Sequence, residues 1–278
     1  MTRFAGLVIA VLGCVGSSRP LLICHNANCA EGNTVEADDT LGALRASLAL
    51  RTPGGEVVFD GMELDSVWDR GLGRCTFAHA PGPGAPDFAQ AVALVAAHVA
   101  ASAPDHAAHT SAHPALYLKI ELKTDVGGGA PHTPDEVAAH VACVTAAARA
   151  VITAGVASHN VVVPIFDSDD PALPAAIDPG AFLDSSGREC LFETGWGTAL
   201  PAGFTAQIRT LDWYDDPEAI DWGQGTRGQD ATSGGSPRGL LIWARNPSLA
   251  DLDAMLVHDP AYVGVNNIEE ARGLLDAP

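Results

Sequence analysis

Polar residues follow or interrupt three short apolar runs of this chain, and their types suit chemistry on a charged substrate. In chain order they are His25, Glu63, Asp65, Glu121 and Lys123, with His79 a short distance after Asp65. Glu63 and Asp65 are two positions apart, so a strand would point both carboxylates to the same side. Two carboxylates held side by side repel each other unless a cation neutralises them, which predicts a site for a hard divalent metal.

Two histidines near such a metal would supply an acid and a base. His25 and His79 flank the acidic pair in sequence, so they would complete an acid–base pair around that metal. Each residue also has a structural interpretation: a histidine at a strand end often only donates a hydrogen bond, and Glu121 with Lys123 can form an internal ion pair. We favour the functional interpretation, because five of these residues occur at predicted strand ends: His25, Glu63, Asp65, Glu121 and Lys123.

The elements that must position these residues alternate along the chain. Predicted strands cover 21–25, 61–67, 116–123, 160–166, 190–194, 207–212, 239–244 and 262–266, and predicted helices cover 38–51, 86–102, 134–155, 248–257 and 268–275. Alternating strands and helices indicate a parallel sheet with crossover helices. Eight strands predict an α/β fold of the (β/α)8 TIM barrel type, in which active groups gather at the carboxyl ends of the strands. Residues 80–86 and 223–238, rich in Gly, Pro and Ser, are predicted loops.

Composition sets the broad class of protein. The chain has 278 residues, 47% hydrophobic and 18% charged, with a formal net charge of −19. This length suits one barrel domain, predicted over residues 19–278. The negative charge disfavours nucleic acid and anionic membranes as partners, and we expect at most transient membrane contact. The sequence sets no oligomeric state.

The N-terminus predicts an extracytoplasmic protein. Arg3 precedes an apolar run that ends at Val15, and small residues follow, so residues 1–18 fit a signal peptide or a lipoprotein leader that ends near Cys14. A cytoplasmic chain with an ordinary first strand is the alternative. Five further cysteines stand at positions 24, 29, 75, 143 and 190. A Cys29–Cys75 bridge is one pairing that would join two site loops, and Cys143 is expected to be a buried thiol.

These motifs together resemble the glycerophosphodiester phosphodiesterase superfamily, which includes the sphingomyelinase D (phospholipase D) toxins. The resemblance rests on 21–26, Gly32-Asn33-Thr34, 61–65, His79 and 119–123, and on a tryptophan, Trp243, in the seventh strand and the turn 264–267. It implies a barrel of phospholipase-C-like phosphodiesterases. It also implies roles: His25 and His79 as catalytic histidines, and Glu63, Asp65 and Glu121 as ligands of one divalent cation, Mg²⁺ before Ca²⁺.

The same resemblance implies substrate contacts and an activity. Lys123 would contact phosphate, and Asn26 and Trp243 would line the substrate pocket. The implied reaction is cleavage of a glycerophosphodiester or a phospholipid headgroup ester, by water or by a hydroxyl of the substrate that closes a cyclic phosphate. Two departures stand out: Asn26 and Gly32 occupy positions where glycerophosphodiesterases usually carry arginine and glutamate. The C-terminal Asn-Pro-Trp signature of the toxin branch is missing.

Other functions remain open on the sequence. A catalytically silent barrel that binds a phosphorylated or sugar-like ligand is the main alternative, and an unrelated metal-dependent hydrolase or a sugar-phosphate isomerase is a third. Further candidates are weaker, with a structural role expected for most of them. They are His106, His109 and His113 for zinc, Asp167, Asp169 and Asp170 for calcium or else for a solvated turn and helix cap, Glu193 for the pocket, and Trp196, Trp213 and Trp222 for a cationic headgroup.

Overall fold

The computed structural model describes most of the chain from residue 19 onward. The described residues are 19–30, 34–102, 116–127, 130–168, 170, 172–182, 190–195, 201, 204, 206–214, 236–258 and 260–276; the side chains of 194, 195, 206, 207, 209 and 236–240 are excluded. The predicted leader, residues 1–18, lies outside these ranges, as do His106, His109, His113, Asp169, Trp196 and Trp222.

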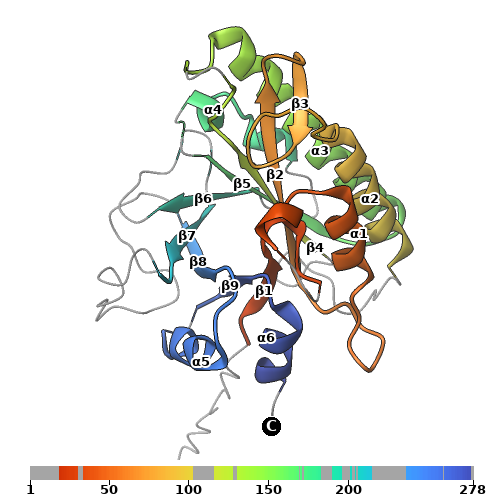
Figure 1. Cartoon of the computed structure of the whole chain (residues 1–278), viewed down its shortest axis with the longest axis vertical. Coiled ribbons are helices and arrows are strands. Elements are labelled where there is room, and N and C mark those ends of the chain that lie inside the picture. Colours follow the sequence, from red (N-terminus) through yellow and green to blue (C-terminus); the bar gives the residue numbers. More distant parts are fainter. Residues whose placement is uncertain are drawn as a thin grey trace, which may run out of the picture.

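Eight parallel strands form a closed barrel (Figure 1). The ring runs β1 (Leu21–Cys24), β2 (Gly61–Asp69), β4 (Leu116–Leu122), β5 (Val162–Asp167), β6 (Leu191–Gly195), β7 (Ala206–Asp212), β8 (Ser236–Ala244) and β9 (Tyr262–Val265). β1 pairs with both β2 and β9, which closes the ring. The predicted (β/α)8 barrel is therefore confirmed.

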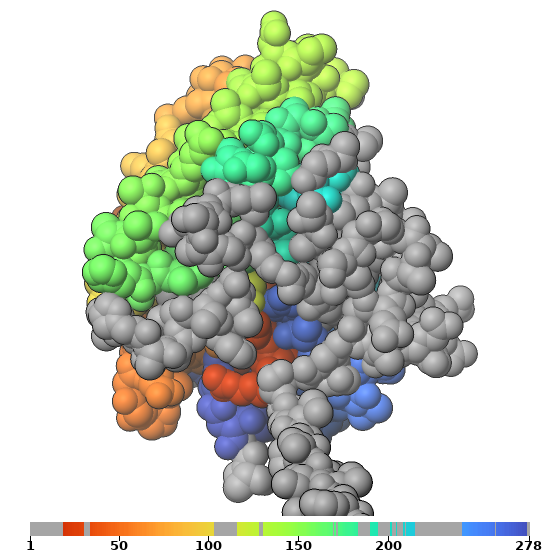
Figure 2. All heavy atoms as spheres, turned by 180° about the vertical axis from the view of Figure 1, so that it is seen from behind, coloured from red at the N-terminus to blue at the C-terminus, as the bar shows by residue number. Residues whose placement is uncertain are grey.

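Helices connect the strands on the outside of the barrel. They are α1 (Leu41–Ala49), α2 (Phe88–Ala101), α3 (Pro134–Ala157), α4 (Ala172–Ala175), α5 (Leu249–Val257) and α6 (Ile268–Leu275), with short 3-10 turns η1 (His25–Ala27), η2 (Val35–Ala37) and η3 (Pro179–Phe182). α3 starts with a capping box formed by Thr133 and Glu136. In the reverse view α3 and the segment after it (green) cover one flank, and the first strand (red) lies near the C-terminal segments (blue) (Figure 2).

Alternation along each strand fills the barrel in two layers. The lower lumen is closed by an apolar cluster of Ile23, Tyr117, Val163, Ile165, Leu191, Ile208, Leu241 and Tyr262. Two residues further along several of these strands, the inward positions become polar; Lys119 follows Tyr117, and Asp167 follows Ile165. Because strand side chains alternate between faces, the same face of each strand supplies the apolar floor first and the polar cavity next.

Three details of the fold differ from the predictions. β3 (Arg74–Phe77) pairs antiparallel with β2 outside the ring and was not predicted. β8 begins at Ser236, inside the stretch predicted to be loop. α1 begins at Leu41, because the Thr40 hydroxyl accepts a hydrogen bond from the Ala43 amide and so caps the helix there.

The cysteine predictions were wrong. Cys29 pairs with Cys24, not with Cys75. Cys75 pairs with Cys143, so Cys143 is not a free buried thiol. The second pairing depends on α3 lying against β3, which brings the two Cα atoms to 6.5 Å. Cys190 is buried and belongs to neither bridge.

Candidate active site

A cavity of about 700 Å³ opens at the carboxyl ends of the barrel strands. Its lining comes from nearly every part of the ring: His25, Asn26, Val35, Asp38, Glu63, His79, Lys119, Glu121, Lys123, Asp167, Glu193, Thr210, Asp212, Tyr214, Trp243 and Arg245. All the residues predicted for the site line this cavity except Asp65, which is fully buried directly behind it. Glu193 is also in the lining, as the sequence suggested.

Strand register brings the three predicted metal ligands together. β2 and β4 run parallel with Asp65 opposite Glu121 and Glu63 opposite Lys119. One carboxylate oxygen from each of Glu63, Asp65 and Glu121 lies within 4.8 Å of the others. Asp65 Oδ1 is buried and has no hydrogen-bond partner among the described residues. Carboxylate oxygens are the donors that Mg²⁺ and Ca²⁺ prefer, so these three residues fit a divalent cation.

Two lysines balance the negative charge in this cavity. Lys123 Nζ lies 2.6 Å from Glu121 Oε1 and 3.4 Å from Asp65 Oδ2. Lys119 Nζ lies 2.8 Å from Glu63 Oε1, and its charge, against the cost of burial, lowers the pKa of Glu63 to about 2. Glu121 behaves in the opposite way, since burial and then the charge of Asp65 raise its pKa to about 7.

His25 is held at a sharp turn directly after β1. Asn26 and Ala27 have positive φ angles of 49° and 53°, which turn the chain across the barrel mouth. The His25 ring stacks on Trp243 with centroids 4.9 Å apart, and its Nε2 lies 4.0 Å from Glu63 Oε2. Trp243, which was predicted to line the substrate pocket, therefore also packs against the His25 ring.

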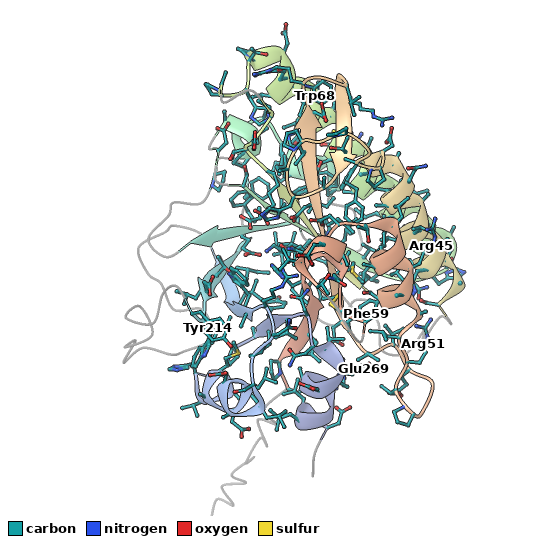
Figure 3. All side chains as sticks on the ribbon, viewed as in Figure 1. Arg45, Arg51, Phe59, Trp68, Tyr214 and Glu269 are labelled. Atoms are coloured by element: carbon teal, nitrogen blue, oxygen red, sulfur yellow. A yellow bond between two sulfur atoms is a disulfide. The ribbon has the colours of Figure 1, made fainter. Side chains whose placement is uncertain are left out.

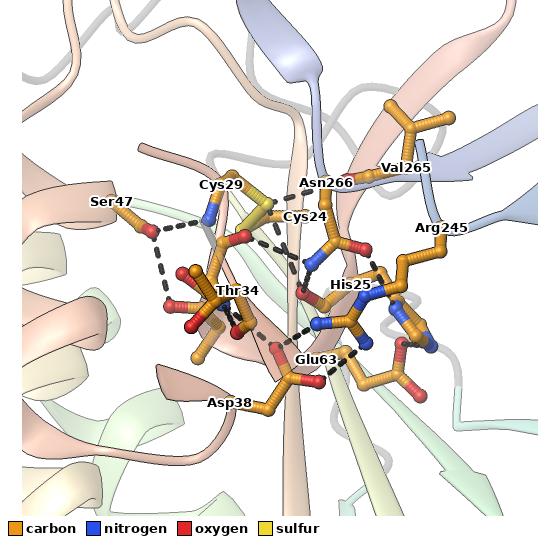
Figure 4. Close-up of a disulfide and its surroundings, with 12 residues drawn as sticks. Cys24, His25, Cys29, Thr34, Asp38, Ser47, Glu63, Arg245, Val265 and Asn266 are labelled. Carbon is orange, nitrogen blue, oxygen red and sulfur yellow. Dashed lines mark hydrogen bonds and ion pairs between the residues drawn. A yellow bond between two sulfur atoms is a disulfide. The ribbon is translucent and has the colours of Figure 1, made fainter. Parts of the chain in front are cut away.

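The partner of His25 also sets its tautomer. Asn266 Nδ2 donates to the carbonyl oxygens of His25, at 3.2 Å, and Asn28, at 2.9 Å. That orientation leaves Asn266 Oδ1 facing His25 Nδ1 at 3.0 Å, so Nδ1 carries the proton and donates (Figure 4). In a neutral ring, Nε2 then has a free lone pair on the side facing Glu63. The sequence resemblance included Asn266, but not this function.

His79 contacts Asp65, the second carboxylate of the Glu63–Asp65 pair. Its Nδ1 lies 2.8 Å from Asp65 Oδ2, although 66% of the His79 side chain is exposed. The hydrogen bond to Asp65 raises the pKa of His79 and favours the protonated ring. An exposed, readily protonated histidine suits proton donation.

Three residues that sequence reasoning passed over also belong to this site. Lys119 sits at the bottom of the cavity, and Arg245 lines its wall. Asp39 is buried with both carboxylate oxygens lacking a partner among the described residues, and burial and the nearby Asp65 raise its pKa well above the usual value. The inward spacing of two residues, from Tyr117 to Lys119 and from Trp243 to Arg245, was the available signal for the two cations.

Two of the remaining candidates have structural positions. Asp170 Oδ1 accepts the Ala172 amide at 2.9 Å, which confirms the helix-cap interpretation for that residue. Asp167 is not a solvated turn residue, because it ends β5 and lies 3.5 Å from Lys119 inside the cavity. Trp213 packs beside the core, and its Nε1 donates to Asp251 at 3.3 Å.

Together these features define a (β/α)8 barrel with two histidines, a carboxylate set and lysines at the carboxyl ends of its strands. No protein-family model matches the chain, and no curated protein matches it. Among solved structures, the crystal structure of glycerophosphodiester phosphodiesterase from Agrobacterium tumefaciens str. C58 is similar, with 11% sequence identity and a TM-score of 0.49. That match covers 92% of this chain and 100% of the other.

Proposed function

We propose that this chain is a metal-dependent phosphodiesterase that cleaves a glycerophosphodiester or a phospholipid headgroup ester by two-histidine acid–base catalysis. The observation that carries the proposal is the convergence, at one cavity, of two histidines held by different partners, Asn266 and Asp65, with three carboxylates whose oxygens lie within 4.8 Å and with Lys123. The motif resemblance to the phosphodiesterase superfamily supports the same choice.

The three carboxylates would hold one divalent cation, Mg²⁺ before Ca²⁺. When bound, the cation would offset the negative charge of the phosphodiester and stabilise the charge that gathers on its oxygens during cleavage. Lys123, already adjacent to Glu121 and Asp65, would add a second positive charge on the same side. A cavity inside a protein of net charge −19 could in this way accept an anion.

The two histidines have distinct roles in this proposal. His25, with Nδ1 bound to Asn266, presents the Nε2 lone pair and removes a proton from water or from a hydroxyl of the substrate. His79, protonated and held by Asp65, delivers a proton to the departing alkoxide. Attack by water leaves a phosphomonoester and an alcohol, whereas attack by the substrate's own hydroxyl leaves a cyclic phosphate and an alcohol.

The two disulfides support an extracytoplasmic location for this enzyme. Cys24–Cys29 and Cys75–Cys143 would persist in an oxidising compartment and would be reduced in most cytosols. At the cavity rim, Val35 is 64% and Tyr214 52% exposed. Tyr214 lies near α5 (Figure 3), and exposed apolar groups there favour a substrate that has a hydrocarbon portion.

Phosphorus NMR tests the proposal directly. Purified protein with Mg²⁺ would be incubated with glycerophosphodiesters, lysophospholipids and sphingomyelin, and a new monoester or cyclic phosphate signal is expected. His25→Ala should abolish that signal while metal binding persists. His159→Asn is the matched control, since His159 is exposed at the end of α3 with a φ of 62° that asparagine tolerates. Metal binding without turnover of any substrate would instead support the silent binding barrel.

A further inference from the structure

The sequence has asparagine, not arginine, directly after His25, but the fold brings an arginine to the same cavity from the other end of the chain. Arg245 comes two positions after Trp243, the residue that stacks on His25, and both line the cavity. Arg245 and its partner Asp38 are separated by 207 residues in sequence. Their meeting is a product of barrel closure.

Asp38 holds Arg245 in a fixed position through an ion pair that uses both terminal nitrogens of the guanidinium. Nη1 lies 2.5 Å and Nη2 2.8 Å from the two oxygens of Asp38. Asn28 Nδ2 also donates to Asp38, at 2.8 Å, and to the Thr34 carbonyl oxygen, at 2.8 Å (Figure 4). Asp38 has a side-chain exposure of only 7%. A paired, planar guanidinium of this kind is preorganised for binding an oxyanion.

The ion pair leaves Arg245 able to donate further hydrogen bonds. It uses two of the five N–H groups of the guanidinium. The Arg245 side chain remains 28% exposed, in contrast to Asp38. The positive partner of this pair is therefore the one that an incoming ligand can reach.

Strand order places Arg245 opposite the other accessible cation. Lys123 follows β4, and Arg245 follows β8, and these two strands are half a ring apart in the order β1-β2-β4-β5-β6-β7-β8-β9. An anion bound across the barrel mouth would meet one cation from each side. A phosphoryl group has several equivalent oxygens and can accept hydrogen bonds from both directions at once.

We propose that Arg245 forms an anion-binding subsite that takes a non-bridging phosphoryl oxygen, with the buried Asp38 carboxylate as its counter-charge. The choice of a phosphoryl group rests on the proposed function; the subsite itself rests on the Arg245–Asp38 geometry. Arg245 supplies, from β8, a guanidinium that the His25–Asn26 segment lacks.

Two variants that break the same ion pair separate binding from simple structural support. With inorganic phosphate as the probe and Mg²⁺-loaded protein, calorimetry should show about tenfold weaker binding for Arg245→Gln. Asp38→Asn should bind phosphate at least as tightly as the parent protein, because the guanidinium loses its counter-charge. Arg245→Lys should give an intermediate affinity. Equal weakening in Arg245→Gln and Asp38→Asn would overturn the proposal, since a purely structural pair is lost equally in both.

A matched charge control excludes a general effect of net charge. Arg70→Gln removes one positive charge from an ion pair with Glu136 that lies outside the cavity, and phosphate affinity should not change. Turnover assays then separate the two proposals. Phosphate binding that depends on Arg245 in a protein without diesterase activity would reject only the proposed function. Diesterase activity with an unchanged KM in Arg245→Gln would reject only the subsite.

Discussion

Two groups of charged residues occupy neighbouring inward-facing positions of the same barrel, two residues apart along β2 and β4, but differ in how their charges are paired. The inner cluster consists of Lys119 with Glu63, Asp167 and Glu193; the outer cluster consists of Asp65, Glu121, Lys123 and His79. In the inner cluster, Lys119 Nζ lies 2.8 Å from Glu63, 3.0 Å from Glu193 and 3.5 Å from Asp167. In the outer cluster, the histidine is 66% exposed and Asp65 Oδ1 has no partner among the described residues.

Depth in the barrel explains this difference. Lys119 and Glu121 are neighbours on the same face of β4, yet Lys119 is buried and paired with carboxylates of three strands, whereas Glu121 faces the mouth. A buried ammonium must be surrounded by acceptors, because an uncompensated charge in the interior is very costly. The inner cluster thus holds Glu63 in place. The outer cluster retains a carboxylate oxygen that is unpaired within the described part of the chain and an exposed histidine, which a ligand could contact.

The largest expected effect comes from removing the charges that would hold the cation. Glu63→Gln together with Asp65→Asn should abolish metal binding and lower turnover by about a thousandfold or more, since metal and electrostatic contributions are worth several kcal/mol. Titration calorimetry and steady-state kinetics measure both quantities. The control is Glu193→Gln, an inner-cluster change that should retain metal binding. Undiminished metal-dependent activity in the double variant would disprove this site.

The two lysines should differ in their effect on stability. Lys119→Met leaves buried carboxylates without their cation and should lower the free energy of unfolding by about 3–5 kcal/mol. Lys123→Met should cost less than Lys119→Met, because Lys123 is more exposed and His79 still pairs with Asp65. Urea denaturation in the presence of a chelator compares them without interference from bound metal. Similar losses for the two variants would mean that the clusters do not differ as described.

One disulfide lies beside His25 at the barrel mouth and the other joins β3 to α3 outside the ring, so removing each should affect stability and activity differently. Chain-entropy arguments give about 4 kcal/mol for the Cys75–Cys143 bridge, with its sequence separation of 68, and about 2 kcal/mol for Cys24–Cys29, with a separation of 5. Activity should follow the reverse order, because Cys24 and Cys29 flank His25 (Figure 4). We expect paired serine substitutions at 24 and 29 to lower kcat about tenfold. Thermal unfolding and kinetics on both pairs test this; a larger kcat loss for the Cys75–Cys143 pair would contradict it.

The smallest predicted effect is a pH dependence of metal binding at Glu121. Its pKa of about 7 means that below neutrality a proton must leave before the carboxylate can bind a cation. Metal affinity should therefore rise by up to tenfold per pH unit towards pH 7 and level off above it. Glu121→Gln should remove this dependence. A slope unchanged by that substitution would assign the proton to another group.

The same shift has a consequence for the metal-free protein. The folded pKa of Glu121 lies above its ordinary value of 4.5, so the native state binds more protons than the unfolded chain between these values. Stability from this group is therefore present below about pH 4.5 and is lost as the pH rises through about 7. In a chelator, the protein should be more stable at pH 5 than at pH 8, and bound metal should reduce that difference.

Much of the barrel could be predicted because each strand carries a local pattern. Runs such as 116–122 and 162–167 are mostly apolar, with charged residues only from the middle to the carboxyl end, and the eight predicted strands all occur. β3 was missed because Arg74–Phe77 has only four residues, and an alternation this short does not distinguish a strand from a loop. The Cys75–Cys143 disulfide could not be predicted, since the two cysteines meet only when α3 packs on the β2–β3 hairpin.

The sequence by itself determined the alternation of strands and helices, the barrel, and the polar residues at the strand ends, because these depend on neighbours within a few positions. Only the tertiary structure decided which of those residues meet. Barrel closure brings Arg245 to Asp38, and strand register sets Lys119 beside Glu193, 74 residues away. Such pairs leave no local pattern, since they form only when distant strands enter the same ring and share a low-dielectric interior.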